Sequence, residues 1–149
     1  MLTAIKAGAD YIDIELDADT SYRLKLLEEA KKHGREVIIS YHNFDHTPEA
    51  SMLREIVESC KKAGADIVKI ACLVKTRQDV QALFAAYREN LRMVVIGMGR
   101  MGLITRVAAP FLGAEFTFAS PGDGRETAPG QVDKRKLTEL TQLNRDMRH

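Results

Sequence analysis

The chain has 149 residues, 45% of them hydrophobic, and a formal net charge of only +1, because 22 basic residues nearly balance 21 acidic ones. This length indicates one domain with a real core, and the scattered charges argue against nucleic-acid binding and against a charged membrane surface. No apolar run approaches the 18 residues of a membrane span and the first residues lack the pattern of a signal peptide, so we expect a cytoplasmic protein.

Strand-like and helix-like segments alternate along the chain after a first stretch, Leu2–Ala7, that has the character of a helix end. Short runs rich in Val, Ile or Phe predict strands, and apolar residues at helical spacing predict the helices between them. The predicted order is strand Tyr11–Leu16, helix Ser21–His33, strand Glu36–Tyr41, helix Pro48–Ala63, strand Asp66–Leu73, helix Gln78–Asn90, strand Met93–Met98, helix Leu103–Phe111, strand Ala114–Ala119 and helix Asp133–Met147.

Particular residue types mark several of these helix ends. Thr47 is expected to act as an N-cap, with Pro48 at the first helical position, and Thr76 is expected to cap the next helix. Gly64 suits the left-handed conformation that stops a helix.

The alternation predicts βαβ units and a parallel sheet. A faint repeat, in which "KAGADYIDIE" (Lys6–Glu15) matches "KAGADIVKIA" (Lys62–Ala71), favours a (β/α) barrel of the TIM type over a doubly wound sheet. A closed eight-stranded barrel needs about 200–250 residues, whereas five strands already occupy this chain. Two alternatives follow: an open five-stranded α/β sheet, or a single domain (residues 1–149) that forms the last five βα units of an incomplete barrel.

Four polar residues lie within or just after apolar strands. Because successive strand residues face opposite sides, Asp13 and Glu15 share one face of their strand, and the apolar residues between them share the other. In a barrel, this polar face would point into the lumen together with His42 and Lys69. Each residue also has a structural explanation. The two acids could form the polar face of an exposed edge strand, and His42 could be a loop histidine bonded to backbone. Lys69 could make a buried salt bridge to Asp13 or Glu15, or be a lysine of an edge strand.

Taken together, the four residues indicate Schiff-base chemistry. A lysine in a poorly solvated site favours its neutral amine, which can attack a carbonyl group and form an imine. A histidine nearby can then move protons at neutral pH. The sequence therefore predicts a reactive lysine, Lys69, assisted by His42.

Other motifs carry weaker signals. The glycine-rich "GMGRMG" (Gly97–Gly102) has neither a Walker pattern nor a dinucleotide fingerprint, so close backbone approach is the preferred explanation. Downstream of it, Arg106 is either a solvated helix residue or a bidentate clamp for a carboxylate. The long Gly- and Pro-rich loop Ser120–Val132 is of the kind that covers sites. Cys60 and Cys72 have no metal-ligand spacing and are expected to be reduced thiols.

At these residues the chain resembles type I 3-dehydroquinate dehydratase, the Schiff-base enzyme of the shikimate pathway. The resemblance runs across essentially the whole chain, and several motifs occur in the family's order. They are "YIDIEL" (Tyr11–Leu16), "ISYHNFDHTPE" (Ile39–Glu49), "IVKIA" (Ile67–Ala71), "GMGRMGLITR" (Gly97–Arg106) and "TAPGQ" (Thr127–Gln131).

The resemblance implies a role for each matching residue. Lys69 would form the imine, and His42 would transfer protons. Arg106 would bind the substrate carboxylate, while Thr127, where the family usually has serine, and Gln131 would contact the substrate from a closing loop. Three further residues would support the site from nearby: Asp13, Glu15 and Met98.

The resemblance also implies what this chemistry needs. The substrate would be 3-dehydroquinate, a small molecule, and neither a metal nor an organic cofactor would be required. The family's barrel has about three more strands before "YIDIEL", which supply further substrate-binding residues and a glutamate that supports the histidine. Without them the sheet would have open edges, which favours a homodimer as partner. The alternatives are another class I Schiff-base lyase or aldolase, and an inactive barrel fragment that acts only in binding or assembly.

Overall fold

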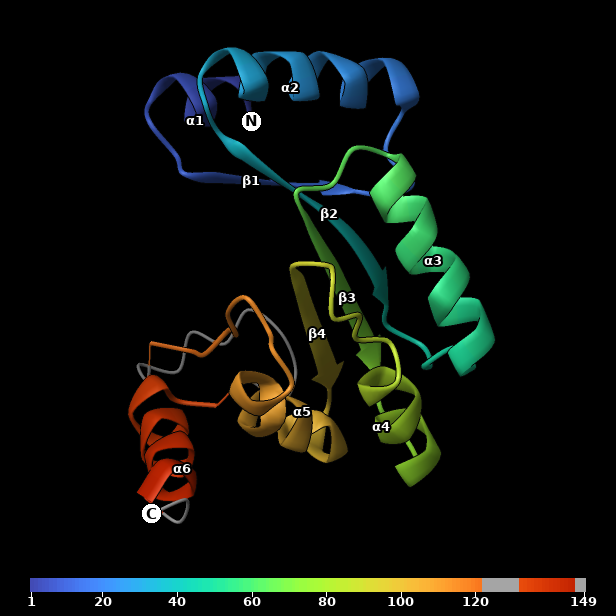
Figure 1. The fold of residues 1–149 in the computed structure, drawn as a ribbon, viewed down its shortest axis with the longest axis vertical. Coiled ribbons are helices and arrows are strands. Elements are labelled where there is room, and N and C mark those ends of the chain that lie inside the picture. Colours follow the sequence, from blue (N-terminus) through green and yellow to red (C-terminus); the bar gives the residue numbers. More distant parts are fainter. Residues whose placement is uncertain (122–131, 147–149) are drawn as a thin grey trace.

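Four parallel strands form the sheet of the computed structural model, which describes residues 1–121 and 132–146 (Figure 1). They lie in chain order as β1 (Tyr11–Glu15), β2 (Glu36–Asn43), β3 (Ile67–Leu73) and β4 (Met93–Met98). The helices that alternate with them are α1 (Leu2–Lys6), α2 (Thr20–Lys32), α3 (Ala50–Lys62), α4 (Arg77–Phe84), α5 (Leu103–Ala108) and α6 (Lys134–Asp146), with 3-10 turns η1 (Arg100–Gly102) and η2 (Ala109–Phe111). None of the helices in this described part is long and apolar enough to cross a membrane.

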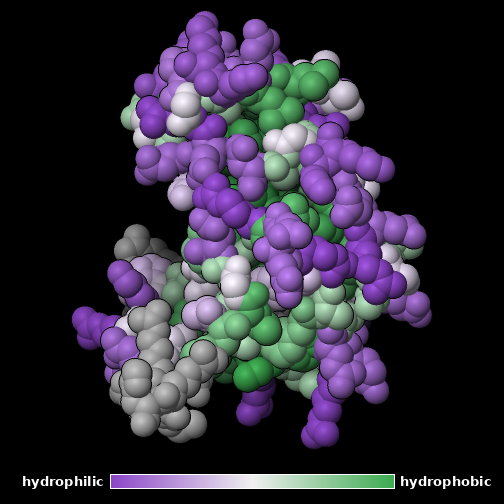
Figure 2. Space-filling model, in the orientation of Figure 1, coloured by the Kyte–Doolittle hydropathy of each residue, from purple (hydrophilic) through white to green (hydrophobic). Residues whose placement is uncertain are grey.

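The two faces of the sheet are buried in different ways. Alternate strand residues such as Ile12, Ile39 and Ile70 pack with Leu26 of α2 and Leu53 of α3 in the larger core. The opposite face carries a smaller apolar cluster of Ile38, Ile67, Ala71, Val94 and Ile96. Helices outside and a separate cluster inside are the layers of a (β/α) barrel, so the chain forms part of a TIM-type barrel, as predicted. The face visible in Figure 2 is largely hydrophilic, with apolar patches between.

The repeated "KAGAD" segments have the same backbone conformation. Gly8 and Gly64 both adopt positive φ, at 97° and 100°, three positions before the first residue of a strand. Each glycine N–H donates to the carbonyl three residues earlier, at 3.2 and 3.1 Å. This confirms Gly64 as a left-handed helix stop and explains the repeat, since only glycine adopts this φ without strain.

The two predicted threonine caps have different outcomes. Thr76 begins α4 in a capping box, in which its hydroxyl accepts from Asp79 N (3.2 Å) and Asp79 Oδ2 accepts from Thr76 N (2.8 Å). The prediction for Thr47 is wrong, because α3 begins later, after Glu49. The Thr47 hydroxyl instead donates to the carbonyl of Leu73 at 2.8 Å, which ties the loop after β2 to the end of β3.

The predicted fifth strand, Ala114–Ala119, does not form. Only Ala114 makes a bridge with Met93, and the N–H of Glu115 donates to the Met93 carbonyl at 2.9 Å. Beyond this point the chain leaves β4, and Phe116 and Phe118 turn their rings onto the apolar cluster inside the sheet. Both rings are partly buried against this cluster.

Candidate active site

The polar strand residues lie on the inner face of the sheet, in successive rows. The parallel register aligns Glu15 of β1 with Ser40 of β2, and Ser40 with Lys69 of β3. The next row toward the carboxyl ends holds His42, and the row before holds Asp13. The prediction that Asp13, Glu15, His42 and Lys69 share one face is therefore confirmed. Glu15 and His42 lie toward the carboxyl ends of their strands, where TIM-barrel sites are found.

Lys69 is largely buried, with only 12% of its side chain exposed. Its Nζ lies 2.6 Å from Asp13 Oδ2, and on another side it lies 5.0 Å from the centre of the Phe118 ring. The pair spans β2, because β1 and β3 are not neighbours in the sheet. The salt bridge considered from the sequence is thus present. A lysine attacks a carbonyl as the free amine, and the Asp13 carboxylate lies close enough to accept the proton that the ammonium form must lose.

His42 lies at the end of β2, held from two directions. Its Nδ1 is 2.6 Å from Glu15 Oε1, although this approach does not have the alignment of a hydrogen bond. Its ring stacks on Phe44, with centroids 5.9 Å apart and planes 8° from parallel. Because Nδ1 lies beside the Glu15 carboxylate, Nε2 is the ring nitrogen that is left for proton transfer. A hollow of about 180 Å³ adjoins the ring, lined by Glu15, Leu16, Asp17, Ser40, Tyr41 and His42.

Arg106 is only 1% exposed, so the alternative of a solvated helix residue is wrong. It projects from α5, and its Nη1 donates to the carbonyl of Phe118 at 3.0 Å. Its Nε has no hydrogen-bond partner among residues 1–121 and 132–142. Burial lowers the pKa of the guanidinium. A buried guanidinium with an unused donor is suited to an anion such as a carboxylate.

The remaining predicted residues have mixed outcomes. Met98 is 2% exposed at the end of β4, in register with Leu73, and has the inward parity of Val94 and Ile96. Thr127 and Gln131 lie outside the residues that the structure describes.

Two residues of the inner face had no role in the sequence-based prediction. Ser40 is 1% exposed and lies between Glu15 and Lys69 in its row. Phe118 contacts both Lys69 and Arg106, the first with its ring and the second with its carbonyl. Strand alternation is a signal for Ser40, which shares a face with His42, whereas no local signal identifies Phe118.

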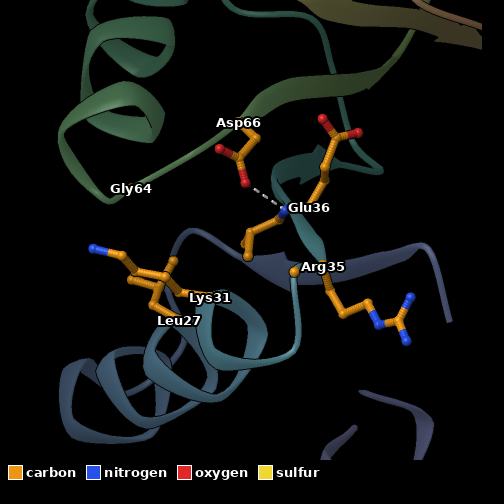
Figure 3. Close-up of a pocket in the computed structure, with 8 residues that line it drawn as sticks. Leu27, Lys31, Arg35, Glu36, Gly64 and Asp66 are labelled. Carbon is orange, nitrogen blue, oxygen red and sulfur yellow. Dashed lines mark hydrogen bonds between the residues drawn. The ribbon is translucent and has the colours of Figure 1, made fainter. Parts of the chain in front are cut away.

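A larger hollow, about 460 Å³, lies at the opposite end of the strands (Figure 3). Charges of both signs line it, among them Lys31, Arg35, Glu36 and Asp66. Asp66 Oδ2 accepts from the N–H of Val37 at 2.8 Å, so this carboxylate supports the start of the β2–β3 pairing. We assign this hollow a structural role, because in this class of fold the residues at the amino-terminal ends of the strands contribute to stability. In the described part of the chain, no group of three or more His, Cys, Asp or Glu side chains could hold a metal ion.

Fold and site together define a protein of the (β/α)-barrel class with a lysine, a histidine and carboxylates on its inner face. Residues 1–147 match the family described as type I 3-dehydroquinase, and the chain belongs to that family.

Relatives and solved structures agree with this assignment. The 3-dehydroquinate dehydratase of Methanosarcina barkeri is 37% identical over 146 residues, which are 95% of this chain and 60% of that protein. The enzyme of the same name from Methanococcoides burtonii is 37% identical over 143 residues, 96% of this chain and 60% of its own length. The chain thus spans about 60% of the length of these curated relatives.

Among solved structures, 3-dehydroquinate dehydratase from Geobacillus kaustophilus superposes with a TM-score of 0.87 at 26% identity, over 97% of this chain and 58% of that one. Type I 3-dehydroquinate dehydratase from Clostridium difficile, solved with covalently modified comenic acid, has a TM-score of 0.86 at 27% identity, over 98% and 59% of the two chains.

Proposed function

We propose that this chain carries the dehydration of 3-dehydroquinate to 3-dehydroshikimate and water through an imine on Lys69. The observation that carries the proposal is the inward-facing Lys69, 2.6 Å from a carboxylate, in the strand motif that the resemblance assigns to the imine-forming lysine. Membership of the family and relatives named 3-dehydroquinate dehydratase support the choice of substrate.

The first steps make the imine. Lys69 passes a proton to Asp13, and the free amine adds to the C3 ketone of the substrate to give a carbinolamine. Loss of water from the carbinolamine leaves an iminium ion, in which the C=N bond replaces the C=O bond. Arg106 binds the substrate carboxylate during these steps, because its buried guanidinium has an unused donor.

The next steps remove water from the ring. The iminium draws electrons from the adjacent C2–H bond, so His42 can take the C2 proton and leave an enamine. The enamine electrons then expel the C1 hydroxyl, to which His42 returns the proton, and water leaves. Hydrolysis of the imine releases 3-dehydroshikimate and regenerates the amine. Thr127 and Gln131 are proposed to contact the bound substrate, and Met98 to line the site.

We also propose that the protein is cytoplasmic and forms a homodimer. β1 has a single strand neighbour in the described sheet, and free strand edges favour pairing with another chain. Sedimentation velocity tests this directly: a dimer at micromolar concentration supports the proposal, and a monomer at the highest soluble concentration contradicts it.

A steady-state assay tests the proposed activity, since the product is a conjugated enone that absorbs in the ultraviolet. The chain should form this product, and His42→Ala should slow turnover by about 10²–10⁴-fold, because it removes the proton-transfer group. His33→Ala is the matched control, because His33 lies at the end of α2 beside Glu29. A chain without turnover, or a His42→Ala variant as fast as the control, would contradict the proposal.

A further inference from the structure

Ser40 is a buried polar residue that the proposed mechanism does not use. It is 1% exposed, and its hydroxyl has no hydrogen-bond partner among the described residues. Native proteins pair nearly all buried hydroxyl groups, because leaving one unpaired is unfavourable. An unpaired hydroxyl on the inner face of the sheet is therefore a place where a ligand would complete the hydrogen bonding.

Ser40 is a neighbour of both reacting side chains, of Lys69 across the strand pairing and of His42 along its own strand. Its neighbours Val37 and Ile39 pack in the outer core, and Ile38 packs in the inner cluster, so alternation directs Ser40 inward. The register places it directly beside Lys69 on β3. His42 follows two residues later on the same strand, about 7 Å further along. The Ser40 hydroxyl therefore shares the inner face with both the amine and the imidazole, and it bonds to neither in the described structure.

Other unpaired atoms gather at the same place. Of the six buried side-chain atoms without a partner in the described residues, three belong to the inner rows: Asp13 Oδ1, Ser40 Oγ and His42 Nδ1. A fourth is Arg106 Nε, next to Phe118. Ser40 and His42 also line the hollow of about 180 Å³ at the strand ends. His42 Nδ1 is 2.6 Å from Glu15 Oε1, so the atoms without a close partner here are Asp13 Oδ1 and Ser40 Oγ, which mark the polar part of the inner face around Ser40.

We propose that Ser40 is a catalytic residue of imine formation, in contact with the carbonyl oxygen that becomes the leaving water. This role rests on the proposed function. As the Lys69 amine adds to the carbonyl carbon, the Ser40 O–H donates a hydrogen bond to the oxygen on which negative charge develops. The nitrogen of the addition product gives one proton to His42, and its oxygen takes the proton that Asp13 accepted from Lys69, which gives the neutral carbinolamine. When the carbinolamine collapses, Ser40 passes its proton to the departing hydroxyl group and takes the proton that His42 holds. The C–O bond breaks, the nitrogen lone pair forms C=N, and the serine hydroxyl is restored.

The test compares Ser40→Ala with Ser59→Ala, which removes the same atom from the exposed face of α3. Each variant receives 3-dehydroquinate with cyanoborohydride at a concentration that makes imine formation rate-limiting, and intact mass follows the adduct. Ser40→Ala should form the adduct about 10- to 100-fold more slowly than wild type, the scale of losing one positioned donor. Ser59→Ala should match wild type.

Thermal unfolding separates this role from a structural one. Because the hydroxyl has no partner within the described protein, Ser40→Ala should keep or raise the melting temperature. Equal adduct rates in Ser40→Ala and wild type would overturn the role of Ser40 and leave the proposed function standing. A lowered melting temperature in Ser40→Ala would likewise overturn it, by showing a structural bond. A wild-type chain that forms no adduct would overturn both proposals.

Discussion

The ion pair between Asp13 and Lys69 joins β1 to β3 across β2, and Asp13→Asn tests its contribution to stability. The variant keeps the size of the side chain and removes the negative charge, which leaves the Lys69 ammonium without its 2.6 Å partner. The lysine is 12% exposed, whereas 35% of the aspartate side chain is exposed. Asp13→Asn should therefore lower the free energy of unfolding by about 2 kcal/mol. This value lies between the roughly 3–5 kcal/mol of a broken buried pair and the roughly 0.2–1 kcal/mol of a surface pair.

The measurement is urea unfolding at neutral pH, analysed as a double-mutant cycle of Asp13→Asn and Lys69→Met. Asp17→Asn is the control, because Asp17 is an exposed residue at the end of the same strand, beside the hollow. The cycle should give a coupling of about 1–2 kcal/mol between the two sites. Coupling below about 0.3 kcal/mol, within the error of additivity, would refute the reasoning that this pair holds the inner face together.

Two further predictions concern residues away from the site. Burial raises the pKa of both Cys60 and Cys72 to about 12, so neither thiol should react with an aromatic disulfide reagent at pH 8 until the protein is unfolded; a thiol that reacts rapidly in the folded chain would contradict this. Hydrogen bonds from Arg92 hold the pKa of Glu36 and Glu115 below their ordinary value of 4.5, so their stabilisation is complete above pH 4.5 and is lost as the pH falls through the lowered values. The free energy of unfolding of Arg92→Met, measured by urea titration, should therefore fall less between pH 7 and pH 3 than that of wild type. Equal falls in the two proteins would contradict a stabilisation by these ion pairs.

Strand alternation was sufficient to predict the inner face from the sequence. A period of two residues assigns each side chain to one side of a strand, so Asp13 and Lys69 could be placed together although 56 positions separate them. The capping box at Thr76 was also predictable, because it is a local interaction. The start of α3 was predicted too early, from Thr47 as N-cap and Pro48 as first helical residue. The Thr47 hydroxyl does not cap the helix but donates to the carbonyl of Leu73, a residue distant in sequence.

The features that sequence could not predict depend on contacts between distant segments. Phe116 and Phe118 alternate as in a strand, but whether a hydrogen-bond ladder forms there depends on how the chain leaves β4. The same segment supplies the partner of the buried Arg106, because the Phe118 carbonyl accepts its hydrogen bond. The composition around an arginine does not reveal which carbonyl will face it.

The central claim is that Lys69 forms an imine with substrate, and covalent trapping tests it most directly. The chain is incubated with 3-dehydroquinate and borohydride, digested, and mapped by mass spectrometry, with Lys69→Ala and the exposed Lys75→Ala as the paired variants. We expect one adduct, on the peptide that contains Lys69, in the wild type and Lys75→Ala and not in Lys69→Ala. An adduct on any other lysine, or an adduct that persists in Lys69→Ala, would contradict the account.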